Sequence, residues 1–321
     1  MKVAQVLGFG DVDRIAVLDW PSPSPSEGSV LVRVKACGLN YADVLQRQGL
    51  YVGGPVPPFV PGMEAAGIVE GNDGARQPIP VGTRVAVVAA GGLHAERVVV
   101  QPAACMPLPD RMSFAHAAAF PIHYLTAYHA LTTVAHARAG ETVLIHASGG
   151  GVGTAAVQIA RILGLRVVAT ASTEAKRSRV RALGATRVVP YESFEDATRE
   201  VTRGRGPDIV LESIGGDVFR RSLAMLAPLG RLVVLGAASG AIAPIDAFRL
   251  VFRSQGVLGF HLSALLRDAD AAKASAGRLL AWIGSGDLEV QVGHEVEFAE
   301  IRRAHQLVAS RDRYGAVVLV H

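Results

Sequence analysis

A strand, a glycine-rich turn and a helix follow one another without interruption at residues 142–163, and this succession constrains the fold most strongly. Residues 142–145 (Thr-Val-Leu-Ile) form a β-branched apolar run that is typical of a buried parallel strand. Glycines follow, and apolar side chains then recur at helical spacing as far as Leu163. Glycine permits a tight turn and a close backbone approach to a pyrophosphate, which the N–H groups and the dipole of the helix would attract. Glycine runs also occur in flexible loops, but the flanking strand and helix favour a dinucleotide-binding βαβ unit.

Residues 1–120 have a different pattern of predicted secondary structure from the rest of the chain. Short strands, such as those expected at residues 30–36 and 83–88, are separated by Gly and Pro, which predicts a small barrel-like domain. The Pro-Ser repeat at residues 21–26 is interpreted as a loop rather than a linker, because a strand follows it directly.

From residue 142 onward, strands and helices alternate, which predicts a doubly wound parallel sheet. Further strands are expected at residues 166–170, 188–189, 209–211 and 232–236, with a helix over 176–183. Upstream, a helix over 114–120 is expected to end at Pro121, and a second helix to span 124–135. A helix over 271–283 and a strand over 316–320 close the chain. We therefore expect a nucleotide-binding domain at residues 121–260, inserted in a domain formed by residues 1–120 and 261–321.

Composition and charge argue against several classes of protein. Lys and Arg number 32 against 28 Asp and Glu, and this small excess is dispersed, so no nucleic-acid-binding surface is expected. Two cysteines cannot form a disulfide framework and fit a reducing compartment. The N-terminus lacks the apolar core of a signal peptide, and no apolar run is long enough to cross a bilayer. We expect a cytoplasmic protein that binds neither nucleic acid nor membranes.

The end of the second strand of the βαβ unit indicates which nicotinamide cofactor is bound. An Asp or Glu there, about 20 residues after the glycines, binds the ribose 2′-hydroxyl of NAD. Here the strand is followed by Ala-Ser-Thr at residues 171–173, and Glu174 lies just beyond. Lys176 lies one turn into the next helix, where its charge can neutralise a 2′-phosphate, which favours NADPH. Alternatively, this lysine and the arginines after it form a solvated helix face, but its position favours the phosphate role.

Four further motifs carry a family resemblance. They are residues 38–43 (GLNYAD), 61–67 (PGMEAAG), 82–85 (GTRV) and 208–216 (DIVLESIGG). With the glycine turn, they make the chain similar, over nearly its whole length, to the zinc-independent quinone oxidoreductase (ζ-crystallin-like) branch of the medium-chain dehydrogenase/reductase superfamily. Glu212 stands where the family more usually has Asp. The resemblance implies an α/β protein in which a Rossmann doubly wound parallel-sheet domain is inserted in a GroES-like β-barrel catalytic domain.

The same resemblance allows a prediction about zinc binding. The alcohol dehydrogenase branch carries Cys and His ligands in the first two motifs, whereas this chain has Asn40 and Met63 at those positions. Cys37 is expected to pack in the core, and two cysteines cannot supply the four-cysteine structural zinc lobe. We predict that the protein holds no metal.

By resemblance, the cofactor NADPH would be bound by three sets of residues. The pyrophosphate set is Ser148, Gly149, Gly150, Gly151 and Val152, and the 2′-phosphate set is Ser172, Lys176 and Tyr191. The remaining cofactor residues, mostly near the nicotinamide, are Asn40, Thr126, Ser213, Gly236, Phe260 and Arg311. Tyr41 and Tyr51 would line the substrate pocket. Alternatively, Tyr191 is an ordinary half-buried aromatic residue. Asp43 and Arg47 can likewise be interpreted as structural residues that only fix the loop carrying Asn40.

Without a metal to polarise it, the substrate must itself be electron-poor, as quinones and α,β-unsaturated carbonyls are. The oxyanion that develops on hydride transfer needs hydrogen-bond donors, for which Asn40 and Tyr51 are the catalytic candidates. The leading hypothesis is an NADPH-dependent quinone oxidoreductase acting on a small electrophile. The alternatives are an enoyl or alkenal reductase and a non-enzymatic NADPH-binding protein, while Asn40 and Met63 argue against a zinc alcohol dehydrogenase.

The resemblance also implies a homodimer, because relatives commonly pair the edge strands of their two Rossmann sheets. Residues 232–235 lead toward that edge, and the apolar residues 241–245 are candidates for the interface. The other interpretation of these residues is an ordinary buried strand.

Overall fold

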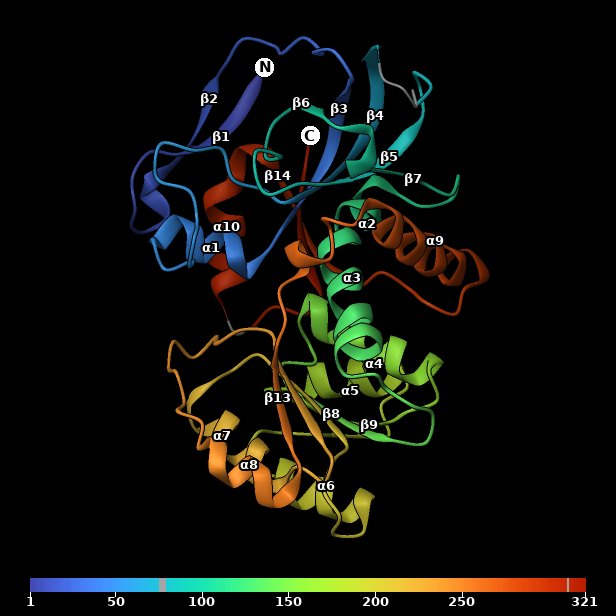
Figure 1. Cartoon of the computed structure of the whole chain (residues 1–321). Coiled ribbons are helices and arrows are strands. Elements are labelled where there is room, and N and C mark those ends of the chain that lie inside the picture. The colour runs from blue at the N-terminus through green and yellow to red at the C-terminus, as the bar shows by residue number, and fades with distance from the viewer. Residues whose placement is uncertain (75–78, 311) are drawn as a thin grey trace. The chain divides into compact units, whose positions relative to one another are not determined.

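The computed structural model describes residues 1–74, 79–310 and 312–321, so the predicted cofactor residue Arg311 lies outside the described residues. The chain forms two compact units (Figure 1). One consists of Met1–His123 with Leu266–His321, and the other of Tyr124–Leu265. The boundaries expected after residues 120 and 260 fall a few residues before these division points.

The unit formed by Tyr124–Leu265 contains a six-stranded parallel sheet with the order β10-β9-β8-β11-β12-β13. Its strands are β8 (Thr142–Ile145), β9 (Arg166–Thr170), β10 (Arg187–Val189), β11 (Ile209–Glu212), β12 (Arg231–Val234) and β13 (Gly256–Gly259). Counted along the chain, this order is 3-2-1-4-5-6, so the doubly wound fold class is confirmed. Every residue of β8 and β11 is buried, which explains why apolar side chains predominate in both strands.

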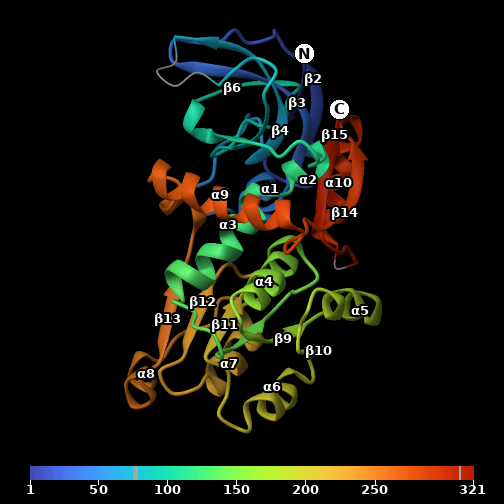
Figure 2. The same cartoon turned by 90° about the vertical axis from the view of Figure 1, so that its right-hand side faces the viewer.

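Helices connect these parallel strands, and Figure 2 shows α4, α5 and α6 beside β9 and β10. The helices are α4 (Gly151–Ile162), α5 (Glu174–Ala182), α6 (Phe194–Thr202), α7 (Gly216–Met225) and α8 (Ala247–Arg253). Phe194 of α6 and Phe219 of α7 pack with Leu144, Val168 and Val210 in one hydrophobic core. This core closes the sheet on the face that α6 and α7 cover.

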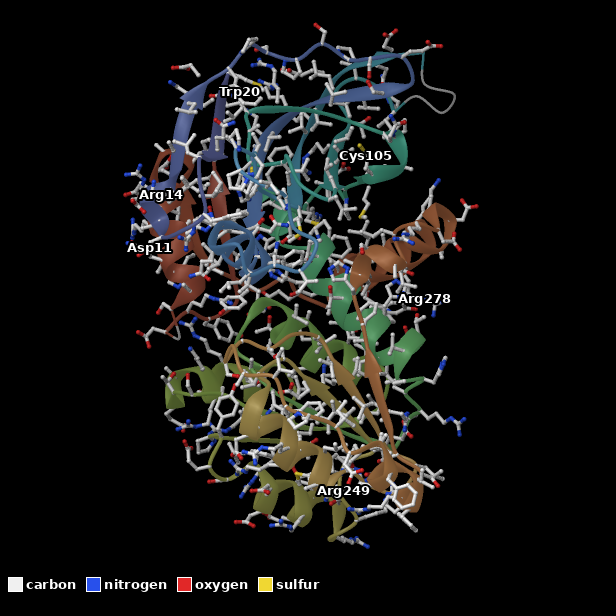
Figure 3. All side chains as sticks on the ribbon, turned by 60° about the vertical axis from the view of Figure 1, so that its left-hand side comes forward. Asp11, Arg14, Trp20, Cys105, Arg249 and Arg278 are labelled. Carbon is white, nitrogen blue, oxygen red and sulfur yellow. The ribbon has the colours of Figure 1, made fainter. Side chains whose placement is uncertain are left out.

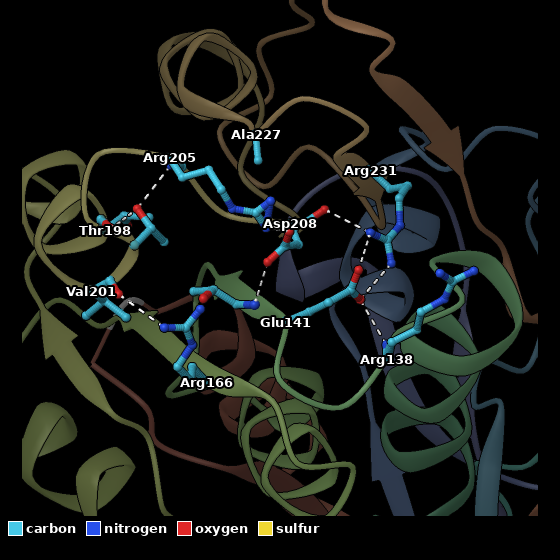
Figure 4. A network of polar contacts seen from close by, with 12 residues as sticks. Arg138, Glu141, Arg166, Thr198, Val201, Arg205, Asp208, Ala227 and Arg231 are labelled. Atoms are coloured by element: carbon cyan, nitrogen blue, oxygen red, sulfur yellow. Dashed lines mark hydrogen bonds and ion pairs between the residues drawn. The ribbon is translucent and has the colours of Figure 1, made fainter.

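A polar network fixes the starts of three strands (Figure 4). The two terminal nitrogens of Arg231 each lie 2.9 Å from a carboxylate oxygen of Glu141. Asp208 accepts a hydrogen bond from the N–H of Thr142 at 2.8 Å and forms an ion pair with Arg205. Because these residues stand at or just before the starts of β8, β11 and β12, the network aligns the strands from the edge opposite to their carboxyl ends.

The other unit contains a seven-stranded sheet with the order β14-β15-β3-β4-β5-β7, in which β6 also pairs with β3, and a separate pair β1-β2. The strands are β1 (Lys2–Val6), β2 (Ile15–Asp19), β3 (Ser29–Leu39), β4 (Glu64–Asp73), β5 (Arg84–Val88), β6 (Arg97–Val100), β7 (Cys105–Pro107), β14 (Val292–Glu297) and β15 (Ala316–Val320). Strand β15 pairs antiparallel with β3, which joins the C-terminal segment to the N-terminal sheet.

Among the described residues, four α-helices belong wholly to this unit. They are α1 (Tyr41–Gln48), α2 (Phe114–Ala118), α9 (Ala269–Ser285) and α10 (Ile301–Ala309). Ile301, Ala304 and Val308 of α10 are buried in the same core as Val32 of β3 and Val317 of β15. The core therefore combines both ends of the chain.

The helices around Pro121 differ from the prediction. Helix α3 (Pro121–His129) begins at the proline instead of after it, and Ala130–Val134 continues as a π-helix. Proline suits the first turn of a helix because its missing N–H would have no partner there. The predicted uniform helix over 124–135 is therefore wrong in its start and in its type. Within the described residues, no helix has the length and apolar character needed to cross a membrane.

Candidate functional site

The turn between β8 and α4 presents backbone N–H groups at a helix start. Gly150 is the N-cap of α4, and no described side chain caps this end. The N–H groups of Gly151, Val152 and Gly153 come too early in the helix to have an intrahelical acceptor. With the positive end of the helix dipole, they form an arrangement that binds phosphate groups.

Gly153 leaves no room for a side chain, and a side chain on Gly149 would press against Lys176. A Cβ on Gly153 would lie 2.4 Å from the carbonyl oxygen of Ala147 and 2.5 Å from Cα of Ser148. A Cβ on Gly149 would lie 3.2 Å from Cδ of Lys176. Gly153 therefore lets α4 approach the preceding turn, and Gly149 lets the lysine side chain lie against the turn.

Ser148 is fully buried, and its polar groups serve the turn itself. Its N–H and its hydroxyl both donate to the carbonyl oxygen of Thr170 at the end of β9, at 3.0 and 2.8 Å. The N–H of Gly150 donates to the carbonyl oxygen of Ala147 at 3.0 Å. Of the predicted pyrophosphate residues, Ser148 and Gly150 thus shape the turn, while Gly151 and Val152 carry N–H groups at the helix start.

Tyr191 contacts the same turn. Its hydroxyl accepts a hydrogen bond from the N–H of Ala147 at 3.0 Å, and its ring is stacked with that of His146 at a centroid distance of 6.0 Å. The two ring nitrogens of His146 lie 3.1 Å from Oγ1 of Thr170 and 2.8 Å from Oγ of Ser222. Burial, together with the charge of Arg221, lowers the pKa of His146 to about 3, so this ring stays neutral. A neutral imidazole with both nitrogens hydrogen-bonded therefore packs against Tyr191, whose hydroxyl binds the turn.

Lys176 and Ser172 lie together beside the turn. Lys176 is 8% exposed, and its Nζ lies 3.3 Å from Oγ of Ser172. Glu174, the acid nearest the strand end, pairs instead with Arg177 at 2.9 Å and Arg181 at 2.8 Å. The arginines thus bind this carboxylate, and Arg177 also donates to the carbonyl oxygens of Ala171 and Ser172, each at 3.1 Å. Beside the turn, Lys176 contributes an ammonium and Ser172 a hydroxyl.

Three predicted residues follow the carboxyl ends of β11, β12 and β13. A Cβ on Gly236 would lie 3.9 Å from the carbonyl oxygen of Ser213, and the N–H of Phe260 donates to the carbonyl oxygen of Val234 at 3.1 Å. Carboxyl ends of parallel strands meet at one edge of a sheet, so the structure brings Ser213, Gly236 and Phe260 to the edge where the glycine turn lies. Thr126 is half-buried in α3.

In the other unit, Asn40 lies between the end of β3 and the start of α1 and is 5% exposed. Its N–H donates to Oδ2 of Asp43 at 2.8 Å, while Oδ1 of Asp43 accepts the N–H of Gly62 at 3.1 Å. Its side-chain Nδ2 donates to Oε1 of Glu64 at 2.8 Å. The second oxygen of Glu64 accepts the N–H of Ile122 at 2.8 Å. Asp43 therefore holds the backbone of Asn40, and Glu64 holds its side chain.

Both of these carboxyl groups are fully buried. Burial raises the pKa of Glu64 to about 8, against the hydrogen bonds from Ile122 and Asn40, and the charge of Asp43 adds to the rise. Burial likewise raises the pKa of Asp43. Gly38 makes room for this group, because a Cβ there would lie 2.5 Å from Cγ of Glu64. Glu64 lies within a motif that carries the family resemblance, but the sequence assigns it no role, since its partners lie far away in the chain.

The predicted substrate residues Tyr41 and Tyr51 are both half-buried in the same unit. Burial and the charge of Asp43 raise the pKa of Tyr51, so its phenol remains a hydrogen-bond donor at neutral pH. Tyr41 begins α1 and interacts electrostatically with Arg313, a residue that no sequence motif singled out. Arg47 is buried and donates to the carbonyl oxygen of Gly10 at 2.6 Å, which fits the interpretation that it fixes the loop.

Within residues 1–74, 79–310 and 312–321, no group of three or more His, Cys, Asp or Glu side chains is arranged to hold a metal ion. The carboxyls of Asp43 and Glu64 both accept hydrogen bonds from Asn40.

Comparisons with known proteins agree with this geometry. A family model described as zinc-binding dehydrogenase matches residues 151–277, and one described as alcohol dehydrogenase GroES-like domain matches residues 26–110. A quinone oxidoreductase of Pseudomonas aeruginosa is 34% identical to this chain, and the match covers 99% of each. The chain belongs to the medium-chain dehydrogenase/reductase superfamily.

Two other proteins are also similar to this superfamily member over its full length. The synaptic vesicle membrane protein VAT-1 homolog of Rattus norvegicus is 31% identical over 100% of this chain and 84% of its own length. The crystal structure of the quinone oxidoreductase from Thermus thermophilus, solved also as its complex with NADPH, is 40% identical and has a TM-score of 0.89, with 100% of both chains covered. The Rossmann and GroES-like folds that the sequence predicts are confirmed by these matches.

Proposed function

We propose that this member of the medium-chain dehydrogenase/reductase superfamily is an NADPH-dependent quinone oxidoreductase. The observation that carries the proposal is the pairing of Lys176 with Ser172 beside a glycine turn that opens a helix. The similar proteins described as quinone oxidoreductases, one of them in complex with NADPH, support it and favour quinones over enoyl or alkenal acceptors.

The residues present fit NADPH. The N–H groups of Gly151 and Val152 would bind the pyrophosphate, since α4 begins there without a side-chain cap. Lys176, Ser172 and Tyr191 would surround the adenosine 2′-phosphate, with the buried ammonium of Lys176 as a counter-charge. The residues assigned to the rest of the cofactor are Asn40, Thr126, Ser213, Gly236, Phe260 and Arg311. When bound, NADPH supplies a hydride from C4 of its nicotinamide.

The chemistry of the donor set supports a reaction that needs no metal. Asn40 uses its amide nitrogen to bind Glu64, and the neighbouring Met63 offers only a thioether. Zinc sites use thiolates, imidazoles and carboxylates, and catalytic sites need three of them around one point. An electron-poor quinone accepts a hydride without a Lewis acid.

The chain's own residues would orient the acceptor and stabilise its developing charge. Asn40 and Tyr51 are the proposed hydrogen-bond donors to the oxyanion, and Tyr41 lines the substrate side. Addition of one hydride and one proton converts the quinone to the hydroquinone, and the proton is proposed to come from Tyr51 or from solvent. Tyr51 fits the hydrogen-bond donor role because a phenol is protonated at neutral pH, and burial with the charge of Asp43 raises its pKa further.

The test follows NADPH absorbance with purified protein and 1,4-benzoquinone, beside NADH, an alkenal and an enoyl thioester, with and without EDTA. We expect turnover of the quinone that prefers NADPH and ignores EDTA. Turnover of the alkenal or thioester without turnover of the quinone would replace the proposal with an enoyl or alkenal reductase. NADPH binding without turnover of any acceptor would indicate a non-enzymatic binding protein.

We further propose that two copies of the chain form a homodimer through β13 and the segment before it. β13 is an edge strand of the parallel sheet, so its outward N–H and C=O groups can pair with a second copy. The preceding segment is unusually apolar for a surface: Ile242, Phe248, Val251 and Phe252 are 92%, 70%, 67% and 76% exposed. Figure 3 labels Arg249, which lies on α8 within this apolar segment. An exposed cluster of this kind beside an open sheet edge favours self-association.

We also propose a cytoplasmic location, on the basis of the two unpaired cysteines, Cys37 and Cys105. Cell fractionation followed by immunoblotting tests it. Recovery of the protein in a membrane or secreted fraction would overturn it.

A further inference from the structure

Five large apolar side chains are exposed on two loops of the unit that contains Asn40. The first loop, residues 7–10, follows β1, and the second, residues 49–59, lies between α1 and β4. Exposed hydrophobic clusters mark binding surfaces, because contact of apolar groups with water is unfavourable. We call these five side chains, which are between 48% and 97% exposed, the apolar rim: Leu7, Phe9, Leu50, Val52 and Val56.

Hydrogen bonds hold the first loop against both ends of the second. At one end, the N–H of Gly10 donates to the carbonyl oxygen of Arg47 at 3.0 Å, and Nη1 of Arg47 donates to that of Gly10 at 2.6 Å. At the other end, Val6 and Phe59 exchange two backbone hydrogen bonds, at 2.9 and 3.1 Å. The apolar rim therefore stands on two loops that are fixed to each other.

Side-chain packing joins the same two loops. The ring of Phe9 lies over Gly49, where a Cβ would be 3.0 Å from Cγ of that ring. Gly49 has the left-handed conformation that ends α1, with φ at 75°, and Leu50 follows it directly. Glycine thus both allows the chain to leave the helix and leaves space for the phenylalanine next to the second loop.

Tyr51, the proposed hydrogen-bond donor to the acceptor, stands within the apolar rim. It lies between Leu50 and Val52 in the chain and is half-buried. Its carbonyl oxygen accepts the N–H of Gly54 at 3.0 Å, and a Cβ on Gly54 would lie 3.3 Å from Cβ of Tyr51. This turn fixes the tyrosine beside the exposed side chains, so a ligand bound at Tyr51 would have apolar surface next to it.

The charge of the two loops indicates which kind of group the apolar rim can bind. Residues 7–10 and 48–63 contain no charged side chain. Surfaces that bind anionic lipid headgroups or phosphates carry Lys or Arg. An uncharged alkyl group needs only apolar contact. The absence of charge therefore favours an alkyl group over a phosphate or an anionic membrane surface.

We propose that the apolar rim binds an alkyl substituent of the acceptor, so that the enzyme prefers alkylated quinones to unsubstituted benzoquinone. The inference rests on the proposed function, in which Tyr51 donates a hydrogen bond to the quinone oxygen. The alkyl group takes no part in hydride transfer, so its burial stabilises the bound substrate and the transition state equally. It should lower KM and leave kcat nearly the same.

A series of 2-n-alkyl-1,4-benzoquinones from methyl to hexyl tests the proposal, because the inductive effect of the substituent barely changes along it. With NADPH, we expect kcat/KM to rise about two- to fourfold per added CH₂, and at least about 30-fold from methyl to hexyl. A hexyl-to-methyl ratio below about threefold in wild type would overturn the inference.

The triple variant L50Q/V52T/V56T makes the apolar rim polar at exposed positions, where the new side chains need no room in the core. Its hexyl-to-methyl ratio, taken within the same protein, should fall to about threefold or less. V81T is the control, because Val81 is 63% exposed in the same unit but lies outside both loops, and it should keep the wild-type ratio. A folded triple variant with the wild-type ratio would contradict the proposal.

Binding of 4-n-alkylphenols, measured by calorimetry, distinguishes this inference from the proposed function, since these phenols accept no hydride. Their affinity should rise with chain length in wild type and much less in the triple variant. Such a rise in a protein that reduces no quinone would overturn the proposed function alone. Quinone reduction without any dependence on chain length would overturn the inference alone.

Two further measurements detect other partners of the apolar rim. If a second copy covers it, light scattering would give the triple variant a lower mass than wild type. If a membrane surface covers it, wild type would sediment with phosphatidylcholine vesicles and the triple variant would not. Either result overturns the proposal that the acceptor covers the apolar rim.

Discussion

At the scale of single residues, Lys176 has the position from which a charge can distinguish NADPH from NADH. The residue is 8% exposed, so a bound 2′-phosphate would meet a partly desolvated ammonium. Lys176→Ala should raise KM for NADPH about tenfold or more and leave KM for NADH nearly unchanged, because a hydrogen bond to a charged group contributes about 1.5–3 kcal/mol. Steady-state kinetics with both cofactors measures this. Arg179→Ala, on the exposed part of the same helix, is the control, and an equal loss with NADH would contradict the phosphate role.

His305 is a second residue with a measurable consequence. It is fully buried, and neither ring nitrogen has a hydrogen-bond partner among the described residues. Burial is the main cause that lowers its pKa from 6.5 to about 3. Below pH 6.5, His305 therefore binds a proton in the unfolded chain but stays neutral in the folded protein. Its protonation lowers the free energy of unfolding progressively as the pH falls toward 3.

His305→Leu removes both the unbonded nitrogens and the proton uptake. We expect it to raise the free energy of unfolding by about 1 kcal/mol at neutral pH. The gain should grow by at most about 1.4 kcal/mol per pH unit below the usual histidine pKa. Urea unfolding at neutral and mildly acidic pH measures the difference, and a gain that does not change with pH would contradict the linkage.

At the scale of elements, two helical glycines give a matched pair. In α4, a Cβ on Gly153 would meet backbone atoms at 2.4 and 2.5 Å, whereas in α9 a Cβ on Gly277 would meet nothing within 4 Å. Gly153→Ala should cost about 1–3 kcal/mol of stability and weaken NADPH binding, because the turn must shift away from the helix. Gly277→Ala should stabilise the protein by about 0.5–1 kcal/mol through helix propensity. Thermal unfolding and NADPH titration check both, and unaltered NADPH binding by Gly153→Ala would show that the turn tolerates the shift.

The elements also show which features the sequence can predict. Strands β9 and β15 match the predicted residues 166–170 and 316–320, because their apolar runs are local signals. The start of α3 was missed because proline both ends helices and begins them, and a local pattern does not distinguish the two. The bonds of Glu64 could not be predicted, because Asn40 and Ile122 lie 24 and 58 residues away and only the folded strands bring them together.

At the scale of the whole molecule, the N-terminal unit depends on the last part of the chain. Strand β15 pairs with β3, and side chains of α10 and β15 share one core with β3. Asn40 follows β3 directly, so the backbone that carries it is fixed by a strand from the C-terminal end. The unit formed by Tyr124–Leu265, in contrast, contains every strand of its own sheet. The two units therefore differ in when they can be completed during synthesis.

The last prediction concerns the assembly of two such chains. Phe248 and Phe252 on α8 lie edge to face with ring centroids 5.1 Å apart, and both rings are mostly exposed. Burying each ring against a second copy would contribute about 1.5–3 kcal/mol, whereas an aspartate there would lose its hydration without a partner. Light scattering should therefore give wild type twice the chain mass of 33.6 kDa and give Phe252→Asp the mass of one chain, with unchanged circular dichroism. Val81→Asp changes a side chain that is 63% exposed in the other unit and should remain dimeric. Wild type that stays at the mass of one chain at every concentration would exclude the dimer.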